Sequence, residues 1–104
     1  MKLHIWRAAE EELAEAALWY EKQREGLGSE FLEEGERCMQ GLLTDPARFP
    51  LLETVPADRS IRRSRLNRFP YVIVFETLSD TVVVLAVAHL HRDFSRLVRR
   101  SSDG

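Results

Sequence analysis

The sequence predicts an α+β fold in which two helices pack on a mainly antiparallel sheet. Helical periodicity fills residues 7–43, and strand-like patterns rich in β-branched residues fill much of residues 59–89. A short alternating stretch, residues 2–6, precedes the helices and predicts a first strand. The expected order is therefore β-α-α-β-β-β, with residues 93–100 as an optional short terminal helix.

The first predicted helix spans residues 7–25. Its apolar positions recur at spacings of three and four and form one stripe: Ala9, Leu13, Ala16, Ala17 and Tyr20. Gly26 and Gly28 supply the positive φ that commonly ends a helix, and Ser29 is the expected N-cap of the next one.

The second predicted helix spans residues 30–43 and ends at Asp45-Pro46. We expect one buried face, made of Phe31, Gly35, Cys38, Met39 and Leu42, and one solvated face, made of Glu33, Glu34, Glu36 and Arg37. With so short a connection, the two helices should form an antiparallel hairpin. Cys38 is interpreted as a core residue, and Trp6 and Trp19 as residues packed within the fold.

Three strands are predicted after the loop at residues 45–58. Residues 61–66 form a basic strand, and residues 71–77 and 81–89 form a hairpin around Ser79-Asp80. The run from Val82 to Ala88 shows no polar alternation, which predicts a central strand covered on both faces.

Length and composition predict one intracellular domain spanning residues 1–104. The single cysteine excludes an intramolecular disulfide and suits a reducing cytoplasm. We see no secretory signal and no apolar run long enough to span a bilayer. No phosphate-binding glycine loop, Ser/His/Asp arrangement or metal-ligand spacing is present, so we expect no cofactor and no metal.

Charge is distributed unevenly along the chain. Residues 1–58 carry six Lys/Arg against thirteen Asp/Glu, a balance of −7, whereas residues 59–104 carry nine Arg against four acids, a balance of +5. Five arginines fall between Arg59 and Arg68. This pattern indicates a basic surface directed at an anionic partner, although mutual neutralisation within the fold is the alternative.

Four motifs resemble the RelE/ParE toxin superfamily of type II toxin–antitoxin systems, whose members include plasmid stabilisation proteins. They are the first-helix pattern around residues 19–21 with Gly26-Leu27-Gly28 and Phe31, the segment 46–50, the strand entry 68–75, and the segment 87–93. The resemblance covers residues 3–100. It implies a toxin that a protein antitoxin silences.

The resemblance also implies two alternative modes of action. RelE-like members cut mRNA in the ribosomal A site, whereas ParE-like members block DNA gyrase. A metal-free ribonuclease needs a general base, a general acid and cationic clamps on phosphate, for which Arg63, Arg65, His89 and Arg92 are the candidates. No catalytic residue is assigned outside that alternative.

We favour a ParE-like gyrase inhibitor, because the acidic helices, the two lysines and a pI near 5.9 are poorly suited to binding ribosomal RNA. The RelE-like endoribonuclease and an inactive antitoxin-binding orphan are the alternatives. The candidates for antitoxin or target contact are Arg62, Arg63, Arg65, Arg68 and His91, with docking of an acidic antitoxin segment as the favoured role.

Overall fold

The computed structural model describes residues 1–53 and 59–92. The elements, in order, are β1 (Lys2–Ile5), α1 (Arg7–Gln23), α2 (Leu27–Gly41), a 3₁₀ turn (Pro46–Arg48), β2 (Ile61–Arg65), β3 (Tyr71–Leu78) and β4 (Thr81–His89). The predicted order is confirmed, and the optional helix at 93–100 lies outside the described residues. No described helix combines the length and apolar character that crossing a membrane requires.

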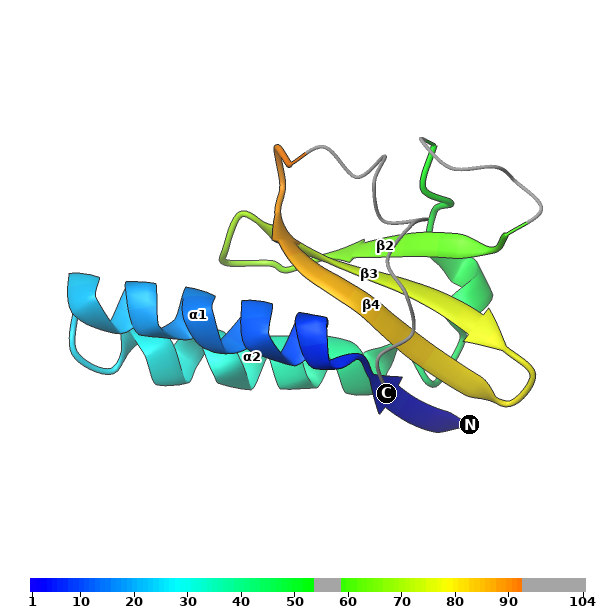
Figure 1. The fold of residues 1–104 in the computed structure, drawn as a ribbon, viewed down its shortest axis with the longest axis horizontal. Helices are drawn as coiled ribbons and strands as arrows, with labels where there is room; N and C mark the ends of the chain where they lie inside the picture. Colours follow the sequence, from blue (N-terminus) through cyan, green and yellow to red (C-terminus); the bar gives the residue numbers. More distant parts are fainter. Residues whose placement is uncertain (54–58, 93–104) are drawn as a thin grey trace.

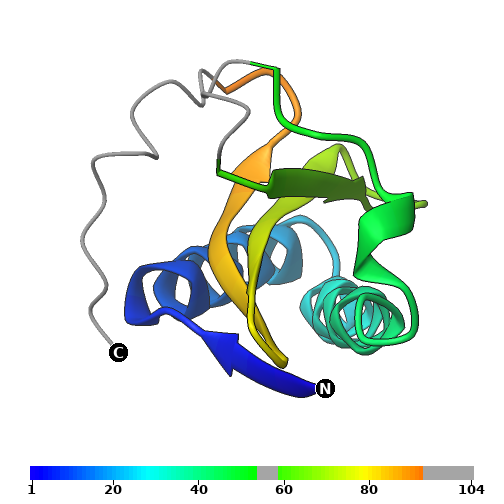
Figure 2. The ribbon, with the colours of Figure 1, turned by 90° about the vertical axis from the view of Figure 1, so that its right-hand side faces the viewer.

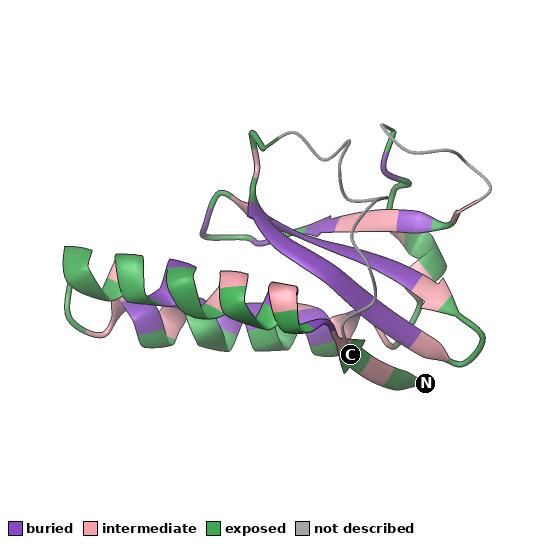
Figure 3. Cartoon of the chain, viewed as in Figure 1, coloured by how far each residue is buried: buried purple, intermediate pink, exposed green. Residues whose placement is uncertain are grey.

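The helical hairpin lies against one face of a four-stranded sheet, and its closed end extends beyond the strands (Figures 1 and 2). The strand order is β1-β4-β3-β2. β1 pairs with β4 in parallel, and the other two pairings are antiparallel. β4 therefore occupies a central position, and every residue from Val82 to Ala88 is buried (Figure 3), as its unbroken apolar run predicts.

The two faces of the sheet can be assigned from the ring contacts of Tyr71. Its ring lies 5.2 Å from Phe31 of α2 and 6.1 Å from Tyr20 of α1, measured between centroids, so it points toward the helices. Side chains alternate along a strand, and directly paired residues share a face. His89, which pairs with Tyr71, therefore shares the helix-facing side, and Val72 lies on the opposite side.

The two edges of the sheet differ. Beside β2, the Leu52 amide donates to the Ile61 carbonyl at 2.8 Å, and the Arg63 amide donates to the Pro50 carbonyl at 3.1 Å. Residues 50–52 thus cover the outer edge of β2 along Ile61–Arg63. A strand of another chain cannot pair with this part of the edge.

The second helix begins earlier than predicted, so the assignment of Ser29 as its N-cap is wrong. α2 starts at Leu27, after Gly26 with a φ of 88°. The side chain of Glu21, on α1, takes the place of a local cap: its carboxylate accepts hydrogen bonds from the Gly26 and Gly28 amides, each at 2.9 Å. A cap donated by the preceding helix leaves no pattern in the residues around Ser29.

Glu34 is buried, which corrects the expectation that it faces solvent. Only 3% of Glu34 is exposed, and its carboxylate accepts a hydrogen bond from the Arg68 amide at 2.9 Å. The bond joins α2 to the turn between β2 and β3. A buried carboxylate is tolerated because it is hydrogen-bonded.

The two tryptophans have different environments. Trp6 is 6% exposed and belongs to the core, as expected, whereas Trp19 is 55% exposed, so the expectation that it packs within the fold is wrong. Trp19 lies beside the buried stripe of α1, and its ring meets that of Tyr20 edge to face, with centroids 5.1 Å apart.

Replacing Gly28 should destabilise the hairpin. A Cβ atom there would lie 2.6 Å from the Ala17 carbonyl oxygen and 3.0 Å from the Glu21 Cβ. We expect Gly28→Ala to lower the free energy of unfolding by roughly 1–3 kcal/mol, because the helices must separate. Gly41→Ala is the matched control: its Cβ meets nothing within 4 Å, so it should be neutral or slightly stabilising. Urea unfolding measures both, and equal effects would contradict the close-contact argument.

Candidate functional site

The basic strand β2 distributes its arginines over both faces of the sheet. Arg63 and Arg65 pair with Val74 and Val72, so their side chains leave the sheet on the side opposite the helices. Arg62 pairs with Phe75 and lies on the other side. Neither the Arg63 nor the Arg65 guanidinium is hydrogen-bonded or ion-paired with another described residue, and Arg65 is exposed.

The other two predicted binding arginines are engaged within the chain. The Arg62 guanidinium donates to the Phe49 carbonyl at 2.6 Å, which ties β2 to the loop after the 3₁₀ turn. Arg68 follows the strand and pairs with Glu30 of α2 at 2.6 Å, and Arg24 approaches the same carboxylate at 3.2 Å. These contacts neutralise part of the positive charge that the sequence places between residues 59 and 68.

A fifth arginine, Arg59, lies just before β2 and is also engaged within the chain. Arg59 forms a two-point contact with Glu76 of β3, with donor–acceptor distances of 2.9 and 3.2 Å. Glu76 is buried. A bidentate contact of this kind is stronger and more directional than a single-point ion pair. The cationic surface left for a partner therefore centres on Arg63 and Arg65, which we call the arginine pair.

His89 and His91 form a cluster of rings with Tyr71 at the end of β4. The His89 ring lies 5.5 Å from the Tyr71 ring and 5.5 Å from the His91 ring, measured between centroids. The His89 Nδ1 atom accepts a hydrogen bond from the His91 amide at 3.3 Å. In the neutral imidazole, this acceptor role leaves the proton on Nε2. Both histidines are exposed.

Glu12 of α1 binds Arg92, the residue that follows His91. One carboxylate oxygen accepts from the Val87 amide at 3.0 Å, and the other pairs with the Arg92 guanidinium at 2.8 Å. These residues line an open hollow of about 350 Å³ whose other walls include Trp19, Tyr71 and His89. The exposed tryptophan makes this hollow a second surface available for contact.

The four residues proposed for a ribonuclease do not converge. Arg63 and Arg65 lie on one face of the sheet, whereas His89 lies on the helix-facing side and Arg92 is paired with a helix residue. A general base and a phosphate clamp must reach the same substrate atoms. Within residues 1–53 and 59–92, no cluster of three His, Cys, Asp or Glu side chains could hold a metal ion.

Cys38 has the properties of a packing residue. It lies partly buried against the core. Burial raises the pKa of its thiol, and the negative charge of Glu34 raises it further. Both effects disfavour the thiolate, which is the nucleophilic form.

Sequence reasoning missed the role of Glu12 and the exposure of Trp19. Helical spacing could have revealed Trp19, because the stripe through Ala16, Ala17 and Tyr20 leaves positions 18 and 19 outside it. No local pattern indicates that Glu12 meets the Val87 amide, since the two residues are 75 positions apart.

Comparison with known proteins identifies the class. A family model described as "ParE toxin of type II toxin-antitoxin system, parDE" matches residues 3–94. The chain therefore belongs to the family of ParE toxins of type II toxin–antitoxin systems, which confirms the resemblance drawn from the sequence. A protein antitoxin is the partner that membership in such a system implies.

A solved structure shows the same fold. The toxin fold resembles a chain described as a chromosomal ParDE toxin–antitoxin system from P. aeruginosa, with a TM-score of 0.77 and 16% sequence identity. The match covers 88% of this chain and 97% of that chain. The search of curated protein sequences gave no match.

Removing the Glu12 carboxylate should loosen the link between α1 and the end of β4. We expect Glu12→Ala to destabilise the protein by about 1–3 kcal/mol, because the buried Val87 amide loses its acceptor. Glu11→Ala, at an exposed neighbouring position, should change stability by less than about 0.5 kcal/mol. Chemical denaturation compares the two variants. If Glu12→Ala is as stable as the unaltered protein, the hydrogen bonds of Glu12 contribute nothing to the free energy of unfolding.

The ion-pair group around Glu30 predicts a pH dependence. The pKa of Glu30 is lowered from its ordinary 4.5, first by the hydrogen bond from Arg68 and then by that from Arg24. As the pH falls, the unfolded chain therefore binds this proton before the folded chain does. The stabilisation is complete above pH 4.5 and is lost as the pH falls through the lowered value.

Thermal unfolding between neutral and acidic pH tests this dependence. Glu30→Gln should lose less stability on acidification than the unaltered protein, because it lacks the titrating group. Glu33→Gln, an exposed neighbour on α2, should behave as the unaltered protein does. Identical acid profiles for Glu30→Gln and the unaltered chain would refute the assignment.

Proposed function

We propose that this toxin inhibits DNA gyrase through protein–protein contacts and is held inactive by an antitoxin that covers the arginine pair. The observation that carries the proposal is the match to the ParE toxin family over residues 3–94. Gyrase inhibition is the mode of action that the ParE-like resemblance implies.

The arrangement of charged residues supports a protein target over RNA. The ribonuclease candidates lie on different faces, and Arg92 is already paired with Glu12. The two helices and the turn between them carry ten glutamates between Glu10 and Glu36, which repel a phosphate backbone. A gyrase inhibitor needs no general base or phosphate clamp.

The arginine pair is suited to an acidic antitoxin segment. Both guanidinium groups leave β2 on the side that the helices do not cover, two residues apart along one strand. Guanidinium groups bind carboxylates with two hydrogen bonds in fixed geometry. Arg62 and Arg68 act mainly by holding β2 and its turn in place, because they bind Phe49 and Glu30 within the chain.

Expression of the chain without its antitoxin tests the target. We expect growth arrest accompanied by induction of a DNA-damage reporter, and we expect the purified chain to inhibit supercoiling of relaxed plasmid by gyrase. His89→Ala should keep both effects, because His89 has no catalytic task in this mode. Primer extension on cellular mRNA serves as the control and should show no new 5′ ends.

Two other results would overturn the proposal. Translation arrest with site-specific mRNA cuts, abolished by His89→Ala or Arg65→Ala, would establish the RelE-like ribonuclease. Normal growth at high expression of folded protein would indicate an inactive antitoxin-binding orphan.

Charge reversal tests the antitoxin contact separately. We expect Arg63→Glu with Arg65→Glu to weaken binding of the co-encoded antitoxin by at least about tenfold, because attraction to an acidic segment becomes repulsion. Lys22→Glu with Arg37→Glu makes the same change of charge at exposed helix positions and should leave affinity within about twofold. Calorimetry measures both, and equal losses would mean that net charge, not this surface, governs binding.

A further inference from the structure

The hollow between α1 and the end of β4 combines an exposed aromatic ring with an exposed carboxylate. Trp19 and Glu15 line it from the helix, and Tyr71 and His89 line it from the sheet. Trp19 is 55% exposed, and Glu15 is exposed as well. A large aromatic side chain left in solvent beside a hollow is typical of a contact surface. We call this place the Trp19 hollow.

The helix places the indole ring and the carboxylate one turn apart. Glu15 and Trp19 are four residues apart, so their side chains leave the same face of α1 with Cβ atoms about 5–6 Å from each other. Ala16, in the same lining, has only a methyl group and is 6% exposed. The space above that methyl group belongs to the hollow of about 350 Å³. A single flat group can therefore reach the ring and the carboxylate together.

The Trp19 hollow carries one uncompensated negative charge. Its charged lining residues are Glu12, Glu15 and Arg92. Glu12 and Arg92 neutralise each other at 2.8 Å, and the second oxygen of Glu12 accepts from the Val87 amide. Within residues 1–53 and 59–92, no hydrogen bond or ion pair engages the Glu15 carboxylate. A cation can therefore pair with Glu15 without displacing an existing partner.

A guanidinium group matches this combination of ring and charge. A cation within about 6 Å of the face of an indole ring is attracted by the ring quadrupole. The planar guanidinium can stack on that face while its edge donates two hydrogen bonds to a carboxylate, which the compact ammonium of lysine cannot do. A phosphate fits poorly, because Glu15 repels it and Arg92 is already paired.

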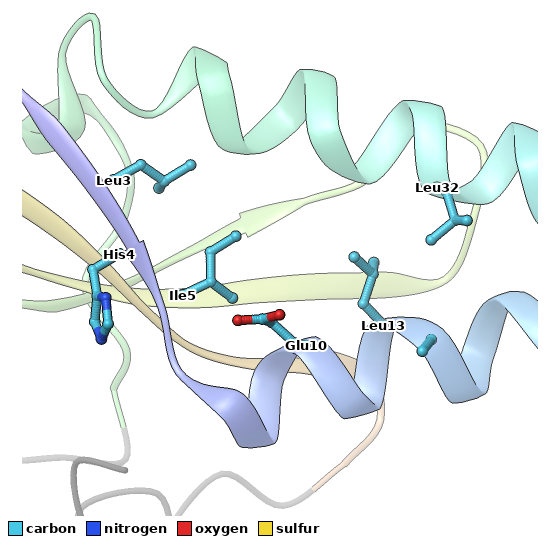
Figure 4. Close-up of a pocket in the computed structure, with 7 residues that line it drawn as sticks. Leu3, His4, Ile5, Glu10, Leu13 and Leu32 are labelled. Carbon is cyan, nitrogen blue, oxygen red and sulfur yellow. The ribbon is translucent and has the colours of Figure 1, made fainter. Parts of the chain in front are cut away.

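A groove beside β1 lacks the aromatic ring that such stacking needs. Its apolar lining is made of Leu3, Ile5, Leu13 and Leu32 (Figure 4). Glu10 of α1 and Glu36 of α2 supply its carboxylates. Among the described residues that line this groove there is no Phe, Tyr or Trp. Acidic charge is thus common to both hollows, and the exposed indole ring distinguishes the Trp19 hollow.

We propose that the Trp19 hollow receives an arginine side chain of the toxin's protein target, with the guanidinium stacked on Trp19 and paired with Glu15. The inference deepens the proposed function and rests on it for the identity of the target. An enzyme that holds DNA carries arginine on its surface, because phosphate contacts dominate its affinity. The contact needs no bond to His89, so His89→Ala should still inhibit gyrase.

A short capped peptide with one arginine between glycine and serine residues serves as the probe. It is titrated into the ¹⁵N-labelled full chain and followed by NMR at the indole N–H of Trp19, with that of Trp6, which is 6% exposed, as the internal reference. We expect a saturable shift at Trp19 with a Kd of about 1–10 mM and no shift at Trp6.

Two further peptides test the chemistry of the bound group. Citrulline has the shape of arginine without its charge, and the citrulline peptide should bind at least about fivefold more weakly. The lysine peptide keeps the charge but not the planar group, and it should bind about threefold more weakly than the arginine peptide.

Matched protein variants locate the contact. Glu15→Gln and Trp19→Leu, followed at the Ala16 amide, should each weaken binding of the arginine peptide at least about threefold. Glu11→Gln and Leu18→Ala change exposed neighbours on α1 that lie outside the lining, and both should bind as the unaltered chain does.

Inhibition of gyrase links the Trp19 hollow to the target. The concentration of chain that halves supercoiling should rise at least about tenfold for Trp19→Ala with Glu15→Gln, because an aromatic anchor and its charge partner are both lost. Leu18→Ala with Glu11→Gln should leave it unchanged. Both double variants should bind the antitoxin as the unaltered chain does, which shows that they are folded.

Three results would contradict the inference: no shift at Trp19 up to about 10 mM arginine peptide, equal binding of the arginine peptide and either of the other two, and unchanged inhibition by Trp19→Ala with Glu15→Gln. A shift caused by a single-stranded oligonucleotide and not by the peptide would assign the hollow to nucleobases instead. Lost antitoxin affinity with unchanged gyrase inhibition would assign it to the antitoxin.

The peptide titration and the gyrase assay fail independently. If the unaltered chain does not inhibit gyrase, the proposed function is wrong, and the titration still decides whether the Trp19 hollow binds a guanidinium group. If the unaltered chain inhibits gyrase and the two double variants inhibit it equally, the proposed function stands and the inference about the hollow is wrong.

Discussion

A cluster of four aromatic rings holds the helical hairpin on the sheet. Tyr20 of α1 lies 5.2 Å from Phe31 of α2 and 4.9 Å from Phe69, and Phe31 lies 5.0 Å from Phe69 and 5.2 Å from Tyr71, all between ring centroids. Three of these four pairs are edge-to-face, and such pairs stabilise beyond the area they bury. Because the rings come from α1, α2, β3 and the turn before it, they fix the relative position of all these elements.

That fixed position separates two surfaces of opposite charge. The hairpin covers the face of the sheet that carries Tyr71, which leaves the arginine pair on the other face. The same hairpin forms two walls of the groove beside β1 and supplies its glutamates. The acidic and basic halves of the sequence therefore lie on different surfaces of the folded protein. Ion pairs at Glu12, Glu30 and Glu76 neutralise part of both charges.

The elements could be predicted well from the sequence because each has its own spacing of apolar residues or is bounded by turn-forming residues. Helical spacing identified the buried face of α1, and the apolar run of β4 predicted its central position. Two predictions on α2 failed because they depend on contacts between different elements. The start of α2 is set by Glu21 on the preceding helix, and Glu34 is buried because the Arg68 amide meets it. Neither contact has a local signature.

The binding residues, too, could be predicted only where local sequence patterns mark them. The arginines of β2 were recognisable as a group, but only the strand register separates Arg63 and Arg65 from Arg62, and only tertiary contacts engage Arg62 and Arg68. Composition could indicate a cationic strand without showing which guanidinium groups remain for a partner. Likewise, β1 was predicted as a strand, but its position at the edge beside a groove follows from the order of the sheet.

The coverage of β2 by residues 50–52 has a consequence for the behaviour of the free chain at high concentration. A sheet with two bare edges can stack end to end without limit, which produces fibres. Here one side is closed by the chain's own backbone, through the Leu52 and Arg63 amides. Because Ile61–Arg63 are covered, edge pairing is left mainly to β1, and a sheet that grows from one edge forms a finite particle and not a polymer.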